Sequence, residues 1–275
     1  MRYAFTLFLV YCSSILAGQT YQQIHQRAVV IDTHNDILSK AIEQGLALDE
    51  DLRGAASSDL NRFAAGGVDA QVFSIWCDQT YGTGTAFKRA TQEIDTLYSW
   101  IKRNPDRMML VKTPAELAKA VKQKKLGCMI GVEGGHMIED DLLKLDSLYR
   151  RGAVYLTLTW NNSTSWASSA MDESQNRLPD SSKGLNSFGK ELVKHLNDLG
   201  MMIDLSHVGE KTFWDVMAIT KKPVLVSHSC AWAICPVFRN LKDDQIKAIG
   251  KNGGLIDINF FSGFLDKQYE DGMKA

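Results

Sequence analysis

The sequence predicts an α/β fold of parallel strands, and two observations favour the (β/α)8 barrel within that class. Short apolar runs alternate with helical patterns along most of the chain, which is typical of parallel strands joined by right-handed crossovers. Histidines and carboxylates follow several of these runs, as expected where the carboxyl ends of barrel strands share one mouth. The residue pattern alone leaves an open doubly wound sheet as the alternative, although no GxGxxG or P-loop pattern follows the first run.

Seven apolar runs are the expected strands. Each is bounded by glycine, proline or polar residues, and most are continuously apolar, as in strands that are buried on both faces. The seven runs are 28–31, 68–76, 128–132, 154–158, 201–205, 224–226 and 255–260.

Helical patterns fill most of the intervals between these runs. Four apolar residues at helical spacing indicate a helix over 90–101. Thr113 opens a capping box with proline at the first helical position, which predicts a helix through Val121. Gly200 is a stop signal for the helix before it. The other expected helices are 138–149, 185–199, 209–219 and 243–249.

The N-terminus has the pattern of a secretory signal peptide. Residues 1–18 hold Arg2, an apolar run through Val10 and small residues before Gln19. The run is too short and too interrupted to predict a membrane span. We therefore expect export to the periplasm or the medium, with 19–275 as one barrel domain. Lipid attachment at Cys12 is not favoured, because bulky Tyr11 precedes it.

Composition excludes several classes of partner. The 275 residues are 45% hydrophobic, and 31 basic against 32 acidic side chains give a net charge of −1. This balance gives no basic footprint for nucleic acid. Cys230 and Cys235 are close enough to pair, but no CxxC motif predicts a zinc–thiolate site. Dimerisation is left open, and a homodimer is compatible with the sequence.

Four expected strands deliver side chains that can bind a metal at their carboxyl ends. The first leads to His34 and Asp36, which point the same way because they are two residues apart on extended chain. The others lead to Glu133, His207 and His228. A single histidine would more often be a capping or core residue, but five such side chains at equivalent positions predict one metal site.

The ligand types predict the metal and its number. Imidazole and carboxylate suit zinc, with manganese, iron or cobalt as competitors. Five ligands exceed the need of one tetrahedral ion, so we expect two ions bridged by Glu133, which lies among glycines at 131, 134 and 135. Two ions would lower the pKa of a shared water and give Glu133 a catalytic role.

The motifs VVIDTHNDI, GGVDAQVFSIW, GVEGGH, YLTLTW, IDLSH, PVLVSHS and FRN, in this order, resemble the membrane dipeptidase family of amidohydrolase-type enzymes. The resemblance covers about residues 28–260. It implies a dinuclear zinc dipeptidase that hydrolyses dipeptides, often with a D-residue at the second position, by attack of a metal-bridging hydroxide. His34, Asp36 and Glu133 would bind one zinc, and Glu133, His207 and His228 the other. Arg239 would bind the substrate carboxylate through its bidentate fork.

Two departures from the family pattern bear on activity. Trp160 stands where the family often has a histidine that stabilises the transition state, and we expect it to contact substrate. Trp160 and Trp166 either line a pocket or pack in the core. The family's eighth-strand aspartate motif is absent, and we expect seven of the eight barrel strands in this sequence.

Three functions therefore remain open. The first is a zinc dipeptidase, and the second is an inactive homologue that keeps the metal site. The third is another amidohydrolase reaction, such as deacylation or lactone hydrolysis, on a substrate that bears a carboxylate.

Overall fold

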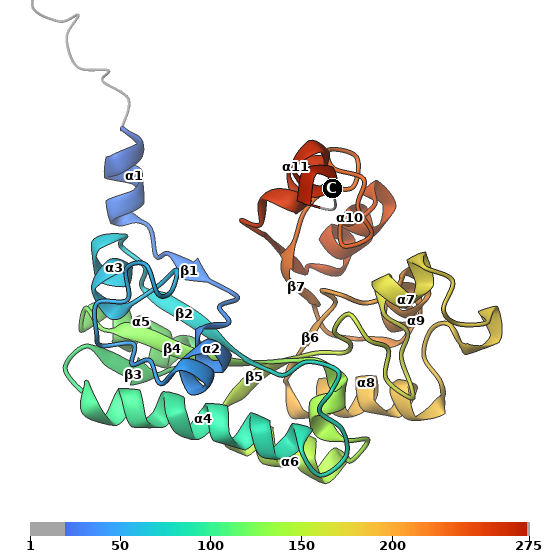
Figure 1. Ribbon diagram of the computed structural model, residues 1–275, viewed down its shortest axis with the longest axis horizontal. Coiled ribbons are helices and arrows are strands. Elements are labelled where there is room, and N and C mark those ends of the chain that lie inside the picture. The colour runs from blue at the N-terminus through green and yellow to red at the C-terminus, as the bar shows by residue number, and fades with distance from the viewer. Residues whose placement is uncertain (1–19, 274–275) are drawn as a thin grey trace, which may run out of the picture.

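The computed structural model describes residues 20–273, and its centre is a curled parallel sheet (Figure 1). The predicted signal peptide and Cys12 lie outside the described residues. The main path of the sheet runs β1-β2-β4-β5-β6-β7-β8, with every pair parallel. Its strands are β1 (Ile31–Asp32), β2 (Ala70–Trp76), β4 (Leu126–Glu133), β5 (Ala153–Thr157), β6 (Met202–Asp204), β7 (Leu225–Ser229) and β8 (Leu255–Ile258).

These strands correspond to the seven predicted runs, so the prediction of an incomplete (β/α)8-type sheet is confirmed. β1 and β8 form the two edges, and no pairing joins them within residues 20–273. β2 and β4 are buried along almost all of their length, in agreement with their largely apolar sequences.

One strand escaped the sequence analysis. β3 (Met108–Leu110) pairs with Leu126–Cys128 at the N-terminal end of β4. β5 pairs with the same strand further along, from Ile130 onward. Three residues between charged neighbours carry too little apolar pattern to predict a strand.

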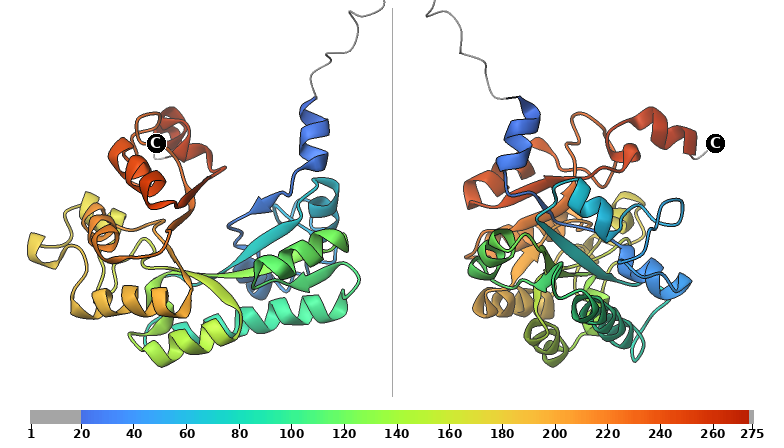
Figure 2. Two further views of the ribbon diagram at one scale, coloured as in Figure 1. Left: turned by 180° about the vertical axis from the view of Figure 1, so that it is seen from behind. Right: turned by 90° about the vertical axis from the view of Figure 1, so that its left-hand side faces the viewer.

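Helices lie around the outside of the curled sheet (Figures 1 and 2). Those described in the structure are α1 (Tyr21–Arg27), α2 (Ile37–Gln44), α3 (Leu60–Ala65), α4 (Ala86–Arg103), α5 (Pro114–Lys122), α6 (Leu142–Arg150), α7 (Ala170–Ser174), α8 (Ser187–Leu199), α9 (Glu210–Ile219), α10 (Asp243–Asn252) and α11 (Lys267–Met273). Short 3-10 turns lie at Gly135–Ile138, Asp180–Ser182 and Ser262–Phe264. Not one described helix has the length and apolar character needed to cross a membrane.

The predicted helix ends are mostly correct. Thr113 caps α5 by accepting from Glu116 N at 3.2 Å, although the Glu116 carboxylate receives Lys112 N rather than Thr113 N. Gly200 ends α8 with φ +72°, a backbone angle that glycine adopts without steric cost. The helix expected from residue 138 begins later, because Asp141 caps α6 with its side chain.

Candidate metal centre

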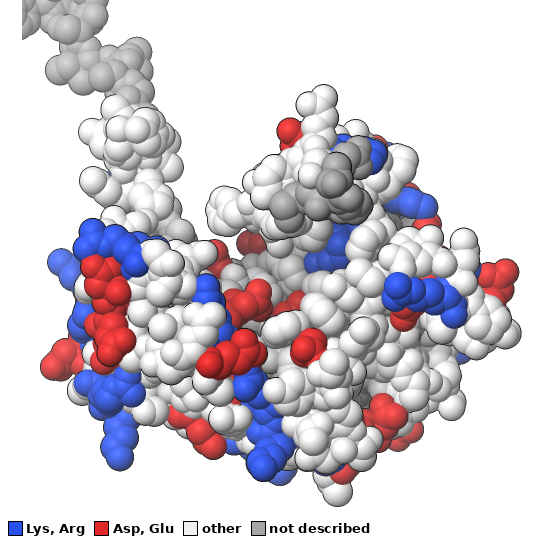
Figure 3. All heavy atoms as spheres, viewed as in Figure 1, with Lys and Arg blue, Asp and Glu red and all other residues white. Residues whose placement is uncertain are grey.

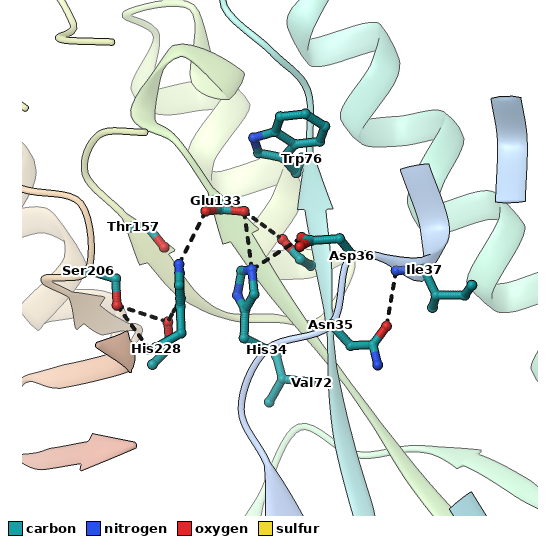
Figure 4. A network of polar contacts seen from close by, with 12 residues as sticks. His34, Asn35, Asp36, Ile37, Val72, Trp76, Glu133, Thr157, Ser206 and His228 are labelled. Carbon is teal, nitrogen blue, oxygen red and sulfur yellow. Dashed lines mark hydrogen bonds and ion pairs between the residues drawn. The ribbon is translucent and has the colours of Figure 1, made fainter. Parts of the chain in front are cut away.

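The five predicted ligand residues lie close together at the carboxyl ends of the strands. Figure 4 shows four of them, His34, Asp36, Glu133 and His228. Glu133 is the last residue of β4. Its two carboxylate oxygens contact different histidines. Its Oε2 atom is 3.3 Å from His34 Nε2. Its Oε1 atom is 2.9 Å from His207 Nε2 and 3.4 Å from His228 Nε2. Asp36 lies beside His34, with its Oδ1 atom 3.1 Å from His34 Nε2.

The backbone holds these residues in different ways. His34 and Asp36 follow β1, and His228 lies within β7. His207 follows β6 with φ +64°, a left-handed conformation that costs on the order of 1 kcal/mol or more outside glycine. Its carbonyl accepts from Ala170 N and Thr159 Oγ1, which fixes this turn. A strained backbone conformation is therefore held in place at one residue of the site.

Each histidine directs Nε2 into the site because its Nδ1 atom is bonded elsewhere. The Nδ1 atom of His228 is 2.8 Å from Ser227 Oγ, and that hydroxyl donates its own proton to Asp204 Oδ2 at 2.7 Å. Ser227 Oγ must therefore accept the Nδ1 proton of His228. The Nδ1 atom of His207 likewise donates to Asn161 Oδ1 at 3.1 Å. In both rings, Nε2 is left with its lone pair.

His34 follows the same rule through Tyr155. The Tyr155 hydroxyl donates to Thr33 O at 3.1 Å and lies 3.3 Å from His34 Nδ1, from which it can accept. Gly131 makes this possible, because a Cβ atom there would lie 2.0 Å from the Tyr155 ring. We expected the glycines beside Glu133 to let backbone approach the site, whereas at Gly131 the space is filled by a phenol ring.

This donor set fits a cation. Three Nε2 lone pairs and two carboxylates converge, and such groups repel one another unless a cation or protons lie between them. The ligand atoms of His34, Glu133 and His228 all lie within 4.8 Å of one another, close enough to bind one metal ion.

The pKa values of His207, His228 and Glu133 favour the forms of these side chains that bind a cation. Burial, and then the charge of Arg239, lowers the pKa of His207 to about 4. Burial and His34 lower the pKa of His228 to about 3, so both rings are neutral near pH 7. Burial alone would raise the pKa of Glu133, but His34 and the hydrogen bonds of the other two histidines bring it well below its ordinary value. Burial alone would lower the pKa of His34, but the carboxylates of Glu133 and Asp36 raise it well above its ordinary value. The site therefore presents a carboxylate and two neutral imidazoles, with a proton on His34 where a metal ion would otherwise balance the carboxylates.

The two predicted substrate residues lie beside this cluster. Arg239 is 6% exposed, and Nη2 donates to His228 O at 3.2 Å. Its Nε atom has no partner, and no carboxylate pairs with this guanidinium among the residues described. Burial lowers the pKa of Arg239 to about 10, so it is still a cation at pH 7. The Trp160 ring centroid is 6.4 Å from that of His207.

A cavity of about 1160 Å³ contains the cluster, Arg239 and Trp160. Figure 3 shows the hollow between the N-terminal and C-terminal elements, with acidic and basic atoms on its walls. Trp166 does not line this cavity. It is fully buried, and its Nε1 atom donates to Asp140 Oδ1 at 2.9 Å, so it is a packing residue. Cys230 and Cys235 are both free thiols.

Comparisons with known proteins agree with the motifs. Residues 19–274 match the family model described as membrane dipeptidase, peptidase family M19. An uncharacterised dipeptidase of Schizosaccharomyces pombe is 33% identical over 272 aligned positions, and the match covers 93% of this chain and 65% of that protein. Dipeptidase 3 of Mus musculus is 34% identical over 240 aligned positions, and the match covers 86% of this chain and 48% of that protein.

A solved structure is also similar. The crystal structure of dipeptidase AC, described as a metallopeptidase of family M19, has a TM-score of 0.78 and 26% identity. The match covers 86% of this chain and 74% of that one. The chain thus spans about two thirds and about half of the lengths of the two curated relatives.

Proposed function

Because the chain belongs to the membrane dipeptidase family, peptidase family M19, we propose that it is a zinc-dependent dipeptidase. Its substrates are dipeptides, including those with a D-residue at the second position. Two zinc ions are its cofactors, with manganese, iron or cobalt as substitutes. His34, Asp36 and Glu133 bind one ion, and Glu133, His207 and His228 bind the other.

The orientation of the Glu133 carboxylate carries this proposal. Its two oxygens face opposite groups, with Oε2 toward His34 and Oε1 toward His207 and His228. A carboxylate that binds a single ion does not need histidines beside both of its oxygens. A carboxylate that bridges two ions does, because each ion takes one oxygen and the histidines next to it. Ser74 Oγ also donates to Oε2 at 3.1 Å and restrains the bridge.

In peptide hydrolysis, the five ligand residues would hold the metal ions and Arg239 would hold the substrate. Two ions held by His34, Asp36, Glu133, His207 and His228 would polarise the peptide carbonyl and supply a hydroxide nucleophile near neutral pH. Arg239 binds the terminal carboxylate, because its Nε atom has no partner and no carboxylate among the side chains that the structure describes pairs with its buried charge. A planar guanidinium holds a carboxylate at two points and so fixes the position of the scissile bond.

Substrate pairs test the role of Arg239. We expect wild-type protein to hydrolyse dipeptides and to hydrolyse the matching dipeptide amides poorly. Arg239→Met keeps the volume of the side chain and should raise KM for dipeptides by about 10–100-fold, since hydrogen bonds to charged groups contribute roughly 1.5–3 kcal/mol. The exposed Arg150→Met is the control and should leave KM unchanged. An unchanged KM in Arg239→Met would favour another amidohydrolase reaction.

Trp160 supports the second candidate, an inactive metal-binding homologue. An indole supplies one N–H donor and cannot accept a proton, unlike the histidine that the family often has there. Metal analysis combined with a panel of L,L- and L,D-dipeptides separates the two functions. Two ions per chain without turnover of any dipeptide would establish the inactive homologue. Fewer than one ion per chain would exclude both.

We also propose that residues 1–18 direct export and are then removed, which leaves a single hydrolase domain. Mass spectrometry of the protein from the secreted or periplasmic fraction tests this directly. A mature N-terminus near Gln19 is expected, and an intact Met1 in that fraction would contradict the proposal.

A further inference from the structure

Two tryptophans form one wall of the cavity. Trp76 is the last residue of β2, and Trp160 follows β5. Their ring centroids are 5.1 Å apart with an interplanar angle of 64°, an edge-to-face arrangement that stabilises the pair. Both side chains are only partly buried, and both line the cavity. We name these two residues the indole wall.

The indole wall lies against the bridging end of the metal site. Trp76 pairs with Glu133 in the register of β2 and β4, and its ring lies next to the Glu133 carboxylate (Figure 4). Trp160 approaches the opposite group, near His207. A substrate whose carbonyl lies at Glu133 therefore has apolar surface within reach on this side.

Core packing does not account for these rings. Trp166 and Trp100 are 1% and 2% exposed, as expected of tryptophans that fill a core. Trp76 instead keeps a partly exposed ring, while its buried Nε1 atom has no acceptor within residues 20–273.

Arg239 sets the direction in which a dipeptide lies. Its guanidinium is bonded to the carbonyl of His228, and its Cζ atom is 5.2 Å from the Phe264 ring, on the β7 and β8 side of the cavity. With the terminal carboxylate there and the scissile carbonyl at Glu133, the first residue of the dipeptide extends beyond Glu133. Trp76 lines the cavity beside Glu133, and Trp160 packs against Trp76.

We propose that the indole wall is the binding pocket for the side chain of the first residue, and that the protein prefers dipeptides with a large apolar or aromatic residue there. This inference rests on the proposed dipeptidase function. Burial of such a side chain against two indoles provides binding free energy that glycine cannot provide. An acidic first residue is disfavoured, because burying its carboxylate against two indoles removes water from the charge without providing a cation.

A substrate series with a constant second residue tests the preference. For wild-type protein, kcat/KM should fall from Phe-Ala and Leu-Ala to Gly-Ala by about 10–100-fold, and Asp-Ala should be the poorest substrate. Trp160→Ala should lower the ratio of Phe-Ala to Gly-Ala at least about fivefold, with the change mainly in Phe-Ala. Trp160→Phe should restore most of the ratio, because it returns an aromatic surface.

Trp214→Ala is the matched control, since Trp214 lies on α9 away from the cavity and should leave the ratio unchanged. Equal kcat/KM for Phe-Ala and Gly-Ala, or a ratio that Trp160→Ala does not change, would overturn the indole-wall proposal and leave the dipeptidase function standing. Loss of every dipeptide activity in metal-loaded wild-type protein would overturn both.

Discussion

The Nε2 atoms of His207 and His228 face each other at 3.0 Å, although both carry lone pairs in the tautomers that their Nδ1 partners select. Two such atoms with Glu133 Oε1 beside them are electrostatically unfavourable without a cation. Metal binding should therefore contribute directly to the stability of the fold.

We expect chelation to lower the melting temperature and added zinc to restore it. A ligand at 1,000 times its Kd stabilises by about 4 kcal/mol, which is several degrees in a protein of this size. Calorimetry with and without EDTA measures the effect. His228→Ala should reduce the response, whereas His195→Ala, which removes a pair with Asp146 away from the site, should keep it in full. Equal melting temperatures in EDTA and zinc would contradict the metal site.

Tyr155→Phe should weaken metal binding with little loss of stability. The ring would still occupy the space opposite Gly131, but His34 would lose the oxygen that accepts from its Nδ1 atom. Partners of this kind are worth about 10–100-fold in metal affinity. A competitive zinc titration measures the change. Tyr98→Phe removes a hydroxyl bonded to Arg151 O on the surface and serves as control. Unchanged zinc affinity in Tyr155→Phe would exclude an orienting role.

The sequence predicted the five ligand candidates and the seven strands of the main path, because both depend on local patterns. Apolar runs mark buried strands, and a polar side chain at the carboxyl end of a parallel strand reaches the shared mouth. The partners of the ligands were harder to predict. Tyr155 reads as part of an apolar strand, and only the folded chain shows that its hydroxyl reaches His34, 121 residues away in sequence.

One weak signal for Tyr155 was present in the sequence. Gly131 interrupts an otherwise apolar strand, and a glycine inside a strand often marks a close approach by another group. The pattern gives the existence of such an approach without naming the group. Asp204 accepts from Ser206 N and Oγ two residues away, whereas its bond to Ser227 links two strands and becomes visible only in the structure.

Asp204→Asn should remove one of two metal ions. Asp204 is fully buried and accepts from Ser227 Oγ at 2.7 Å and Thr157 Oγ1 at 2.5 Å. An amide donor in that place would leave the Ser227 proton free to point at His228 Nδ1, which then favours the tautomer with a proton on Nε2. Nε2 could no longer bind metal.

Metal analysis should then give about one ion per chain instead of two, because His34 and Asp36 are unaffected. Asp146→Asn is the control for a surface aspartate that bonds a histidine. Two ions in folded Asp204→Asn protein would show that Asp204 does not determine the His228 tautomer. A structural role alone would lower stability without this loss of one ion.

Glu93 on α4 should make stability depend on pH. It accepts from Trp76 N at 2.6 Å and from Arg89 Nε at 3.0 Å, and thereby fixes the end of β2 beside the site. Burial raises its pKa from 4.5 to about 8, against the opposing effect of these hydrogen bonds. Between these two pH values the folded chain binds more protons than the unfolded chain, so the free energy of unfolding falls as pH rises. Urea denaturation at pH 5, 6.5 and 8 measures this slope. Glu93→Gln should flatten it, while the exposed Glu191→Gln should match wild type. A slope that survives in Glu93→Gln would assign the pH dependence to other groups.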